Sequence, residues 1–200
     1  EIAANIDGSR ENCRARECEM GNLVADAMLA RTAEMGMTIA IQNGGGLRAS
    51  IGAGTATVGD VLTVLPFQNT IATMQLSGAD IVASLEAAVS GIEDGAGKFP
   101  QVSGLRYAFD KSVAPNEGRI QSVEVMKDGE WVAIDEDEIY GVVTNDFMRK
   151  GGDGYALFAS NAVEAYDYGP GMEEVVAEYL ANNSPYQPVL DGRITVVEAQ

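Results

Sequence analysis

Apolar residues recur three and four positions apart in three stretches of the chain, as they do on the buried face of a helix. These stretches are residues 20–31, 81–89 and 172–183. Ser77 and Asp80 form a capping pattern in front of the second stretch, and Thr57 and Asp60 form the same pattern before a shorter helix that Pro66 ends. The pattern therefore predicts four helices.

Runs of β-branched and aromatic residues predict strands between these helices. The runs cover residues 37–43, 70–77, 104–110, 119–126, 138–144 and 192–197. Asp128-Gly129 is typical of a hairpin turn and leads into a further strand at 130–134. Because helices and strands interleave irregularly, we predict an α+β fold with mixed sheets packed with helices. One domain over residues 1–200 is the default expectation, with two closely joined lobes as the alternative.

Composition and charge narrow the possible partners. The chain of 200 residues is 46% hydrophobic and 22% charged, as in an ordinary globular domain. No apolar run is long enough to span a bilayer, so we expect no membrane span. The net charge of −17 argues against a nucleic acid polymer as partner, because its phosphates need a basic surface. Clustered arginines on so acidic a chain would form a local anion site.

The chain contains no histidine. This absence excludes Ser-His-Asp and Cys-His catalysis, and any zinc or two-metal site would have to rely on carboxylates alone. We therefore expect no catalytic residue, no metal site and no resident cofactor in this chain, and no hydrolysis by it unaided.

The two cysteines, Cys13 and Cys18, lie in the segment CRAREC. Without a partner histidine or further cysteine, a zinc site is disfavoured. A disulfide is favoured over two free thiols, and it would indicate an oxidising compartment.

Four turn segments end regular elements and present polar or aromatic side chains: CRAREC, NGGGLR, LPFQN and NDFMRKGGDGY. Each has an ordinary structural explanation. The glycines of NGGGLR form a tight turn, Phe67 is a core residue, and Asp153 among glycines is common in turns. Considered together, they predict a binding site in which aromatic faces stack a planar base and polar groups hold sugar and phosphate.

These segments also carry a family resemblance. CRARECEMGNLVADAM, NGGGLR, VLPFQN, MQLSG, QVSGLRYAFD and NDFMRKGGDGY occur in the order and approximate spacing found in the C-terminal domain of the 5'-nucleotidase family. That family also includes UDP-sugar hydrolases and 2',3'-cyclic-nucleotide phosphodiesterases. The match covers roughly residues 10–160.

The resemblance implies a division of labour between two domains of one polypeptide. An N-terminal metallophosphatase domain, absent from this chain, would carry two divalent metal ions, and the C-terminal domain would hold the nucleotide or nucleoside. The resemblance also implies a periplasmic or extracellular location.

Carried over residue by residue, the resemblance assigns a role to each matching position. Phe67 and Phe147 match the rings that stack the base, and Asp153 matches the carboxylate that holds the ribose hydroxyls. The remaining substrate-binding positions are Asn43 near the base, Arg14 and Arg48 at the phosphate end, and Gly104 in the segment that lines the base pocket. Arg149 and Lys150 depart from the family pattern and leave the preferred base open.

Three functional hypotheses follow. The first is a substrate-binding and specificity domain of a secreted, metal-dependent nucleotide phosphohydrolase. The second is a stand-alone nucleoside- or nucleotide-binding module without hydrolytic activity. The third keeps the fold but changes the substrate, as in related thiosulfohydrolases, and the two phenylalanines argue against it because a small sulfur compound needs no stacking surface.

Overall fold

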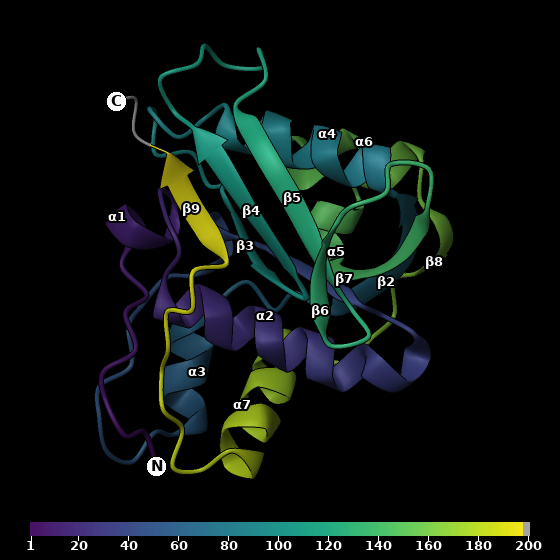
Figure 1. The fold of residues 1–200 in the computed structure, drawn as a ribbon. Helices are drawn as coiled ribbons and strands as arrows, with labels where there is room; N and C mark the ends of the chain where they lie inside the picture. The colour runs from purple at the N-terminus through teal and green to yellow at the C-terminus, as the bar shows by residue number, and fades with distance from the viewer. Residues whose placement is uncertain (198–200) are drawn as a thin grey trace.

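A five-stranded mixed sheet forms the centre of the computed structural model, which describes residues 1–197 (Figure 1). The strand order is β3 (Pro100–Ser103), β1 (Ile39–Asn43), β7 (Ile139–Asn145), β2 (Ile71–Ser77) and β8 (Val163–Tyr166). β1 and β7 are parallel, and every other neighbouring pair in this sheet is antiparallel. The predicted α+β class with mixed sheets is confirmed.

A second, four-stranded sheet covers part of the first. Its order is β6 (Glu130–Ala133), β5 (Ile120–Lys127), β4 (Leu105–Asp110) and β9 (Ile194–Val197). β4 pairs with β5 in antiparallel and with β9 in parallel orientation. The predicted hairpin turn is present between β5 and β6, where Asp128 and Gly129 have φ angles of 52° and 85°.

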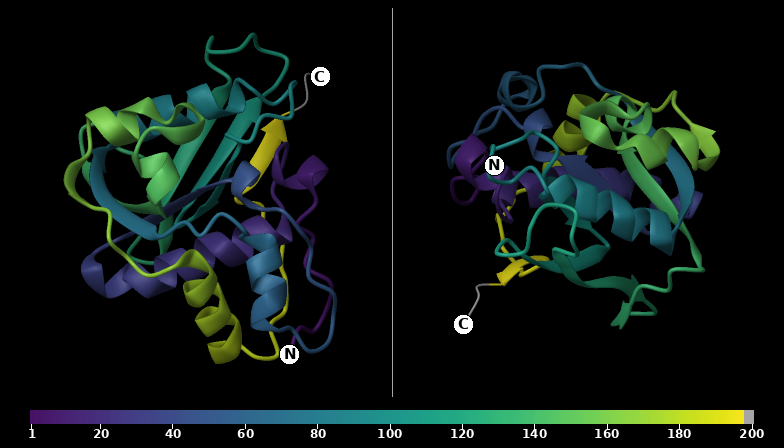
Figure 2. Two further views of the ribbon diagram at one scale, coloured as in Figure 1. Left: turned by 180° about the vertical axis from the view of Figure 1, so that it is seen from behind. Right: turned by 90° about the horizontal axis from the view of Figure 1, so that it is seen from above.

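Helices lie on both sides of the five-stranded sheet. In Figure 1, α2 (Glu19–Thr32), α3 (Val58–Val64) and α7 (Met172–Asn182) lie below the strands, whereas α4 (Gly78–Val89) and α6 (Ala156–Ser160) lie above. The view from behind in Figure 2 shows the same two groups. The shorter elements are α1 (Arg10–Cys13), α5 (Asp146–Arg149), and the 3-10 turns η1 (Ala33–Met35), η2 (Gly44–Gly46) and η3 (Gly152–Gly154).

Two hydrophobic clusters occupy the two faces of the five-stranded sheet. Ile39 and Ile41 of β1 pack with α4, β4 and β5, while Ala40 between them packs with α2, α3 and α7. Val142 and Val143 of β7 alternate in the same way. A parallel pair buried on both faces needs apolar residues at consecutive positions, which explains the continuous apolar runs of these two strands.

Local capping signals identified the helix starts correctly. Thr57 and Asp60 form a complete capping box at the start of α3, and the Ser77 side chain accepts a hydrogen bond from the backbone amide of Asp80 at the start of α4. The sequence did not predict β3 as a separate strand, β8, α5 or α6. β8 is exposed along its whole length, so no alternation marks it, and α5 and α6 are too short to show a helical period.

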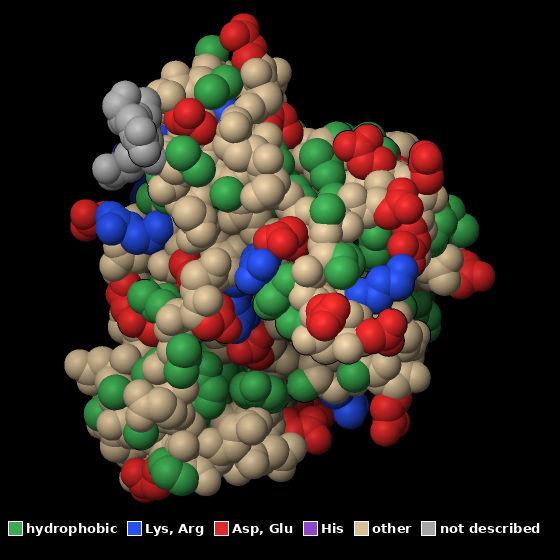
Figure 3. Space-filling view, in the orientation of Figure 1, with side chains coloured by type: hydrophobic (Ala, Val, Ile, Leu, Met, Phe, Trp, Pro, Cys, Tyr) green, Lys and Arg blue, Asp and Glu red, His purple; other side chains and the backbone are tan. Residues whose placement is uncertain are grey.

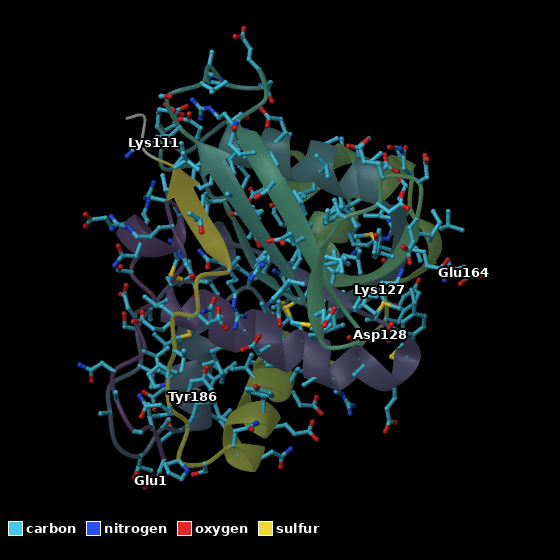
Figure 4. The ribbon with its side chains drawn as sticks, viewed as in Figure 1. Glu1, Lys111, Lys127, Asp128, Glu164 and Tyr186 are labelled. Carbon is cyan, nitrogen blue, oxygen red and sulfur yellow. A yellow bond between two sulfur atoms is a disulfide. The ribbon has the colours of Figure 1, made fainter. Side chains whose placement is uncertain are left out.

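The remaining features of the fold concern the distribution of surface charge and the position of the N-terminus. In Figure 3 the acidic side chains are scattered over the visible face rather than gathered in one patch. Glu1 and Tyr186 lie in the same corner of Figure 4, where the Tyr186 amide donates to the Glu1 carbonyl at 2.9 Å. Among residues 1–197, no helix has the length and apolar character that crossing a bilayer requires.

Candidate functional site

Strand direction brings three of the four turn segments, NGGGLR, LPFQN and NDFMRKGGDGY, to one edge of the central sheet. Because β1 and β7 are parallel, Asn43 and Asn145, their last residues, lie at the same edge. β2 and β3 run the opposite way to these neighbours, so they begin at that edge, with Ile71 opposite Asn145 and Pro100 opposite Asn43. The turns that follow β1 and β7 therefore meet the turns that precede β2 and β3.

A pocket of about 510 Å³ opens between these turns. The residues that line it are Arg14, Asn43, Gly45, Gly46, Arg48, Phe67, Asn69, Gly97, Phe147 and Asp153. All the predicted substrate-binding residues except Gly104 are thus brought to one cavity. They come from positions as far apart in the chain as 14 and 153, so only the fold joins them.

Gly104 lies away from this pocket. It connects β3 to β4 and lines a separate hollow with Arg106 and Trp131. Since β3 begins at the pocket edge and crosses the sheet, the residue after its end must lie at the opposite edge. Gly104 is required there for a different reason: its φ is 71°, and a side chain would overlap the Thr38 carbonyl. Gly97, upstream of β3, reaches the pocket instead.

The two phenylalanines are exposed in the pocket wall. Phe67 is 55% and Phe147 is 44% exposed, so the interpretation of Phe67 as a core residue is wrong. The Phe147 ring lies directly against Gly152, where an added Cβ would come within 2.6 Å of three ring atoms. Glycine at this position therefore lets the ring lie flat against the backbone of η3. The Arg48 guanidinium carbon lies 5.7 Å from the centroid of the Phe67 ring.

Asp153 is held by a chain of buried amides. The Asn43 Nδ2 donates to Asp153 Oδ2 at 2.7 Å, and Asn145 Nδ2 donates to Asn43 Oδ1 at 3.0 Å. Asn145 also donates to Gln42 Oε1 at 2.9 Å and is fully buried. Within residues 1–197, the other carboxylate oxygen of Asp153 has no hydrogen-bond donor, so it is free to accept from a ligand. Asp153 has a left-handed φ of 55°, and its side chain lines the pocket.

Two arginines give the pocket a positive charge. Arg14 is only 8% exposed, its Nη1 donates to the Gly95 carbonyl at 3.1 Å, and its Nε has no partner within the described part of the chain. Burial lowers the pKa of the Arg14 guanidinium, the charges of Arg10 and Arg48 lower it further, and Asp153 raises it. A buried cation with an unsatisfied donor is a place where an anion binds favourably.

The neighbouring basic residues face other groups. Arg149 Nη1 donates to the Phe158 carbonyl at 2.9 Å, and its Nε lies 3.4 Å from Asp167. Lys150 pairs with Asp146 at 2.8 Å. Neither Arg149 nor Lys150 lines the pocket, so the two positive charges that depart from the family pattern do not face the pocket.

Asn69 and Gly97 also line the pocket, and the sequence did not identify either. Asn69 lies two residues after Phe67 in the quoted segment LPFQN, a spacing that could have suggested it. Gly97 lies in a loop whose glycines look alike in sequence. Gly97 is held beside the pocket by Gly45, whose backbone amide donates to the Gly97 carbonyl at 2.7 Å.

Comparison with known proteins identifies the family. The sequence profile of the family described as 5'-nucleotidase, C-terminal domain, matches residues 2–160 of this chain. This chain belongs to that family. As a 5'-nucleotidase C-terminal domain, it is 42% identical over 195 residues to the trifunctional nucleotide phosphoesterase protein YfkN of Bacillus subtilis, covering 96% of this chain and 13% of that protein.

Two further relatives agree with this assignment. The human 5'-nucleotidase is 33% identical over 203 residues, covering 94% of this chain and 35% of the human protein. The crystal structure of a 5'-nucleotidase precursor from Thermus thermophilus superposes with a TM-score of 0.95 at 42% identity, over 100% of this chain and 39% of that one. The chain thus spans well under half the length of each relative.

The domain contains the expected disulfide. Cys13 and Cys18 are bonded, with their Cα atoms 5.2 Å apart, and both are buried. Within residues 1–197, no group of three or more His, Cys, Asp or Glu side chains is placed to hold a metal ion.

Proposed function

We propose that residues 1–200 form one domain that binds the substrate of a 5'-nucleotidase-type phosphohydrolase and holds a nucleotide by its base and ribose. The observation that carries the proposal is a single pocket that combines two exposed rings, a carboxylate and two arginines. These groups match the parts of a nucleotide one by one. The relatives named as 5'-nucleotidases and as a nucleotide phosphoesterase support the same substrate class.

The base stacks between Phe67 and Phe147. Phe67 is 55% and Phe147 is 44% exposed, and both line the pocket, so each ring has surface that a base can cover. One base–aromatic stack contributes roughly 1–3 kcal/mol and tolerates different bases, because every base has a π face. Asn43 and Asn69, in the same wall, offer amide groups to the base edge.

The ribose and phosphate meet charged groups. The oxygen of Asp153 that Asn43 leaves free accepts from ribose hydroxyls. Arg14 and Arg48 bind the phosphate, and the buried Arg14 gains most because a phosphate supplies the anionic partner that the described protein does not.

Hydrolysis is the task of another domain. We propose that a metallophosphatase domain of the same polypeptide, N-terminal to this one, would hold two divalent metal ions, and that these ions would supply the hydrolytic chemistry. This chain contributes positioning and specificity. The Cys13–Cys18 disulfide supports a periplasmic or extracellular location for the whole enzyme.

A stand-alone binding module is the alternative function. It would use the same pocket but have no hydrolytic partner. The gene sequence upstream of Glu1 distinguishes the two, because a metallophosphatase segment there indicates an enzyme. The thiosulfohydrolase hypothesis does not explain why two large rings line the pocket.

Calorimetric titration of the isolated chain tests the proposal. AMP and adenosine should both bind, whereas ribose 5-phosphate, which has no base to stack, should bind at least tenfold more weakly than AMP. Equal affinities for AMP and ribose 5-phosphate would rule out the base sandwich, and no binding of AMP or adenosine would overturn the proposed function.

A further inference from the structure

Arg14 owes its place in the pocket to the backbone of its loop. Its side chain makes one hydrogen bond, to the Gly95 carbonyl, and no ion pair within residues 1–197. The side chain is 8% exposed and so is enclosed by packing, but within the described residues no other polar contact holds its guanidinium. The conformation of the Cys13–Cys18 loop sets where this enclosed side chain begins.

The disulfide fixes only the two ends of this loop. Cys13 and Cys18 are joined, and the amides of Arg14, Ala15 and Arg16 bond back to carbonyls of α1 at 3.0–3.3 Å, but neither set of contacts holds the Cys13 and Arg16 carbonyls. The carbonyl of Cys13 is part of the peptide that leads into Arg14, so its orientation sets the direction in which the Arg14 side chain starts. A second constraint on that carbonyl would complete the loop's shape.

Gln101 supplies this constraint from β3. Its Nε2 donates to the Cys13 carbonyl at 3.0 Å and to the Arg16 carbonyl at 2.7 Å, and its Oε1 accepts from the Cys18 amide at 3.2 Å. Every one of these partners belongs to the loop. The Gln101 side chain thus satisfies the carbonyls of Cys13 and Arg16, on either side of Arg14, and the amide of Cys18, at the end of the loop.

Gln101 is itself held rigidly. It has no exposed surface, and it lies opposite Gln42 in the β1–β3 pair, next to the strand end that carries Asn43. The helix α2 presses against it at Gly21, where any side chain would overlap the Gln101 amide. A buried amide with all its donors committed resists reorientation, because losing a partner would leave a polar group unsatisfied.

We propose that Gln101 is a positioning residue for phosphate binding: it does not line the pocket, but its bonds to the disulfide loop hold Arg14 toward the phosphate end. This inference rests on the proposed function. It predicts that Gln101 affects ligands with a phosphate far more than ligands without one.

The test compares AMP with adenosine in a matched pair of variants. Gln101→Met keeps the size of the side chain but removes its hydrogen bonds, and it should weaken AMP binding about tenfold while changing adenosine binding less than twofold. Gln75→Met is the control. Gln75 bonds Glu164 at 2.7 Å on β8, which lies across the molecule from α1 in Figures 1 and 4, and this variant should change neither affinity.

A double-mutant cycle tests whether Gln101 acts through Arg14. In an Arg14→Ala background, Gln101→Met should cause no further loss of AMP affinity. An additional tenfold loss in that background, or equal losses for AMP and adenosine, would overturn the positioning role. If Gln101→Met does not fold, Gln101→Glu takes its place, since a carboxylate keeps the acceptor for Cys18 and loses the donors; it should show the same selective loss.

Failure of the proposed function gives a different result. A wild-type chain that binds neither ligand would overturn the nucleotide pocket, and the positioning role with it. A wild-type chain that binds both ligands, with an unchanged ratio of affinities in Gln101→Met and Gln101→Glu, would overturn the positioning role alone.

Discussion

Phe147 offers the most direct test of the pocket at the scale of one residue. Replacement by alanine should weaken adenosine binding by roughly 1–3 kcal/mol, because one stacking face is lost, whereas Phe147→Tyr should retain most of the affinity. Since the ring is 44% exposed, the melting temperature should change little. Calorimetry and thermal unfolding measure both effects.

Tyr168→Ala is the matched control for this experiment. Tyr168 is 84% exposed and does not line the pocket, so its loss should leave adenosine affinity unchanged. A Phe147→Ala protein that melts far below the wild type but binds adenosine normally would show that the ring supports the fold and not the ligand.

Asp153 tests the contact with the sugar. Asp153→Asn should weaken binding of adenosine several-fold or more, and should affect its dideoxy analogue much less, because the free carboxylate oxygen acts on the ribose hydroxyls. Asparagine tolerates the left-handed φ of 55°, so backbone strain does not confuse the comparison.

Asp128→Asn is the control for Asp153, since Asp128 has a similar φ of 52° in the β5–β6 turn, labelled in Figure 4. Both adenosine and its dideoxy analogue should bind this variant as they bind the wild type. If Asp153→Asn weakens the two ligands equally, the carboxylate does not act through the sugar.

At the scale of an element, the capping box of α3 is the feature to test. Thr57 Oγ1 donates to Asp60 Oδ2 at 2.7 Å and accepts from the Asp60 amide at 3.3 Å. Thr57→Ala should lower the free energy of unfolding by about 1 kcal/mol, measured by urea denaturation. Thr63→Ala, which changes the same residue type inside the same helix, should have a much smaller effect.

The pH dependence of this effect follows from Asp60. The hydrogen bonds from Thr57 lower the pKa of the Asp60 carboxyl below its ordinary value of 3.8. A lowered carboxyl pKa stabilises the folded state at neutral pH, and this contribution is lost as the pH falls below 3.8 and through the folded-state pKa. The difference in stability between wild type and Thr57→Ala should therefore narrow in acid. A difference that widens there would contradict the capping role.

At the scale of the whole molecule, the division of labour predicts that this chain alone is not a phosphatase. AMP incubated with the chain and zinc, manganese or cobalt should release no phosphate above the rate without protein. The reason is the donor set: the sequence has no histidine, and residues 1–197 offer no cluster of carboxylates or thiols for a metal. Phosphate release at a rate typical of enzymes would refute this division.

Features that depend only on neighbours in the chain could be predicted from the order of the amino acids. The capping box at Thr57, the helix cap at Ser77, the Asp128-Gly129 turn and the buried apolar residues of α2, α4 and α7 were predicted correctly, because each depends on residues within a few positions. The family resemblance predicted the residues that line the pocket, except Asn69 and Gly97, because the motifs that carry the resemblance are also short and local. β8 was missed because an exposed edge strand carries no pattern of burial.

The meeting of distant turns could not be predicted in this way, because it depends on how the strands pack. Strand direction brings the ends of β1 and β7 to the edge where β2 and β3 begin, and this places Gly97 in the pocket and Gly104 at the opposite edge. It also places Gln101 under the Cys13–Cys18 loop, a contact between residues more than eighty positions apart. Strand order and direction result from packing across the whole chain, so no local pattern in the sequence encodes them.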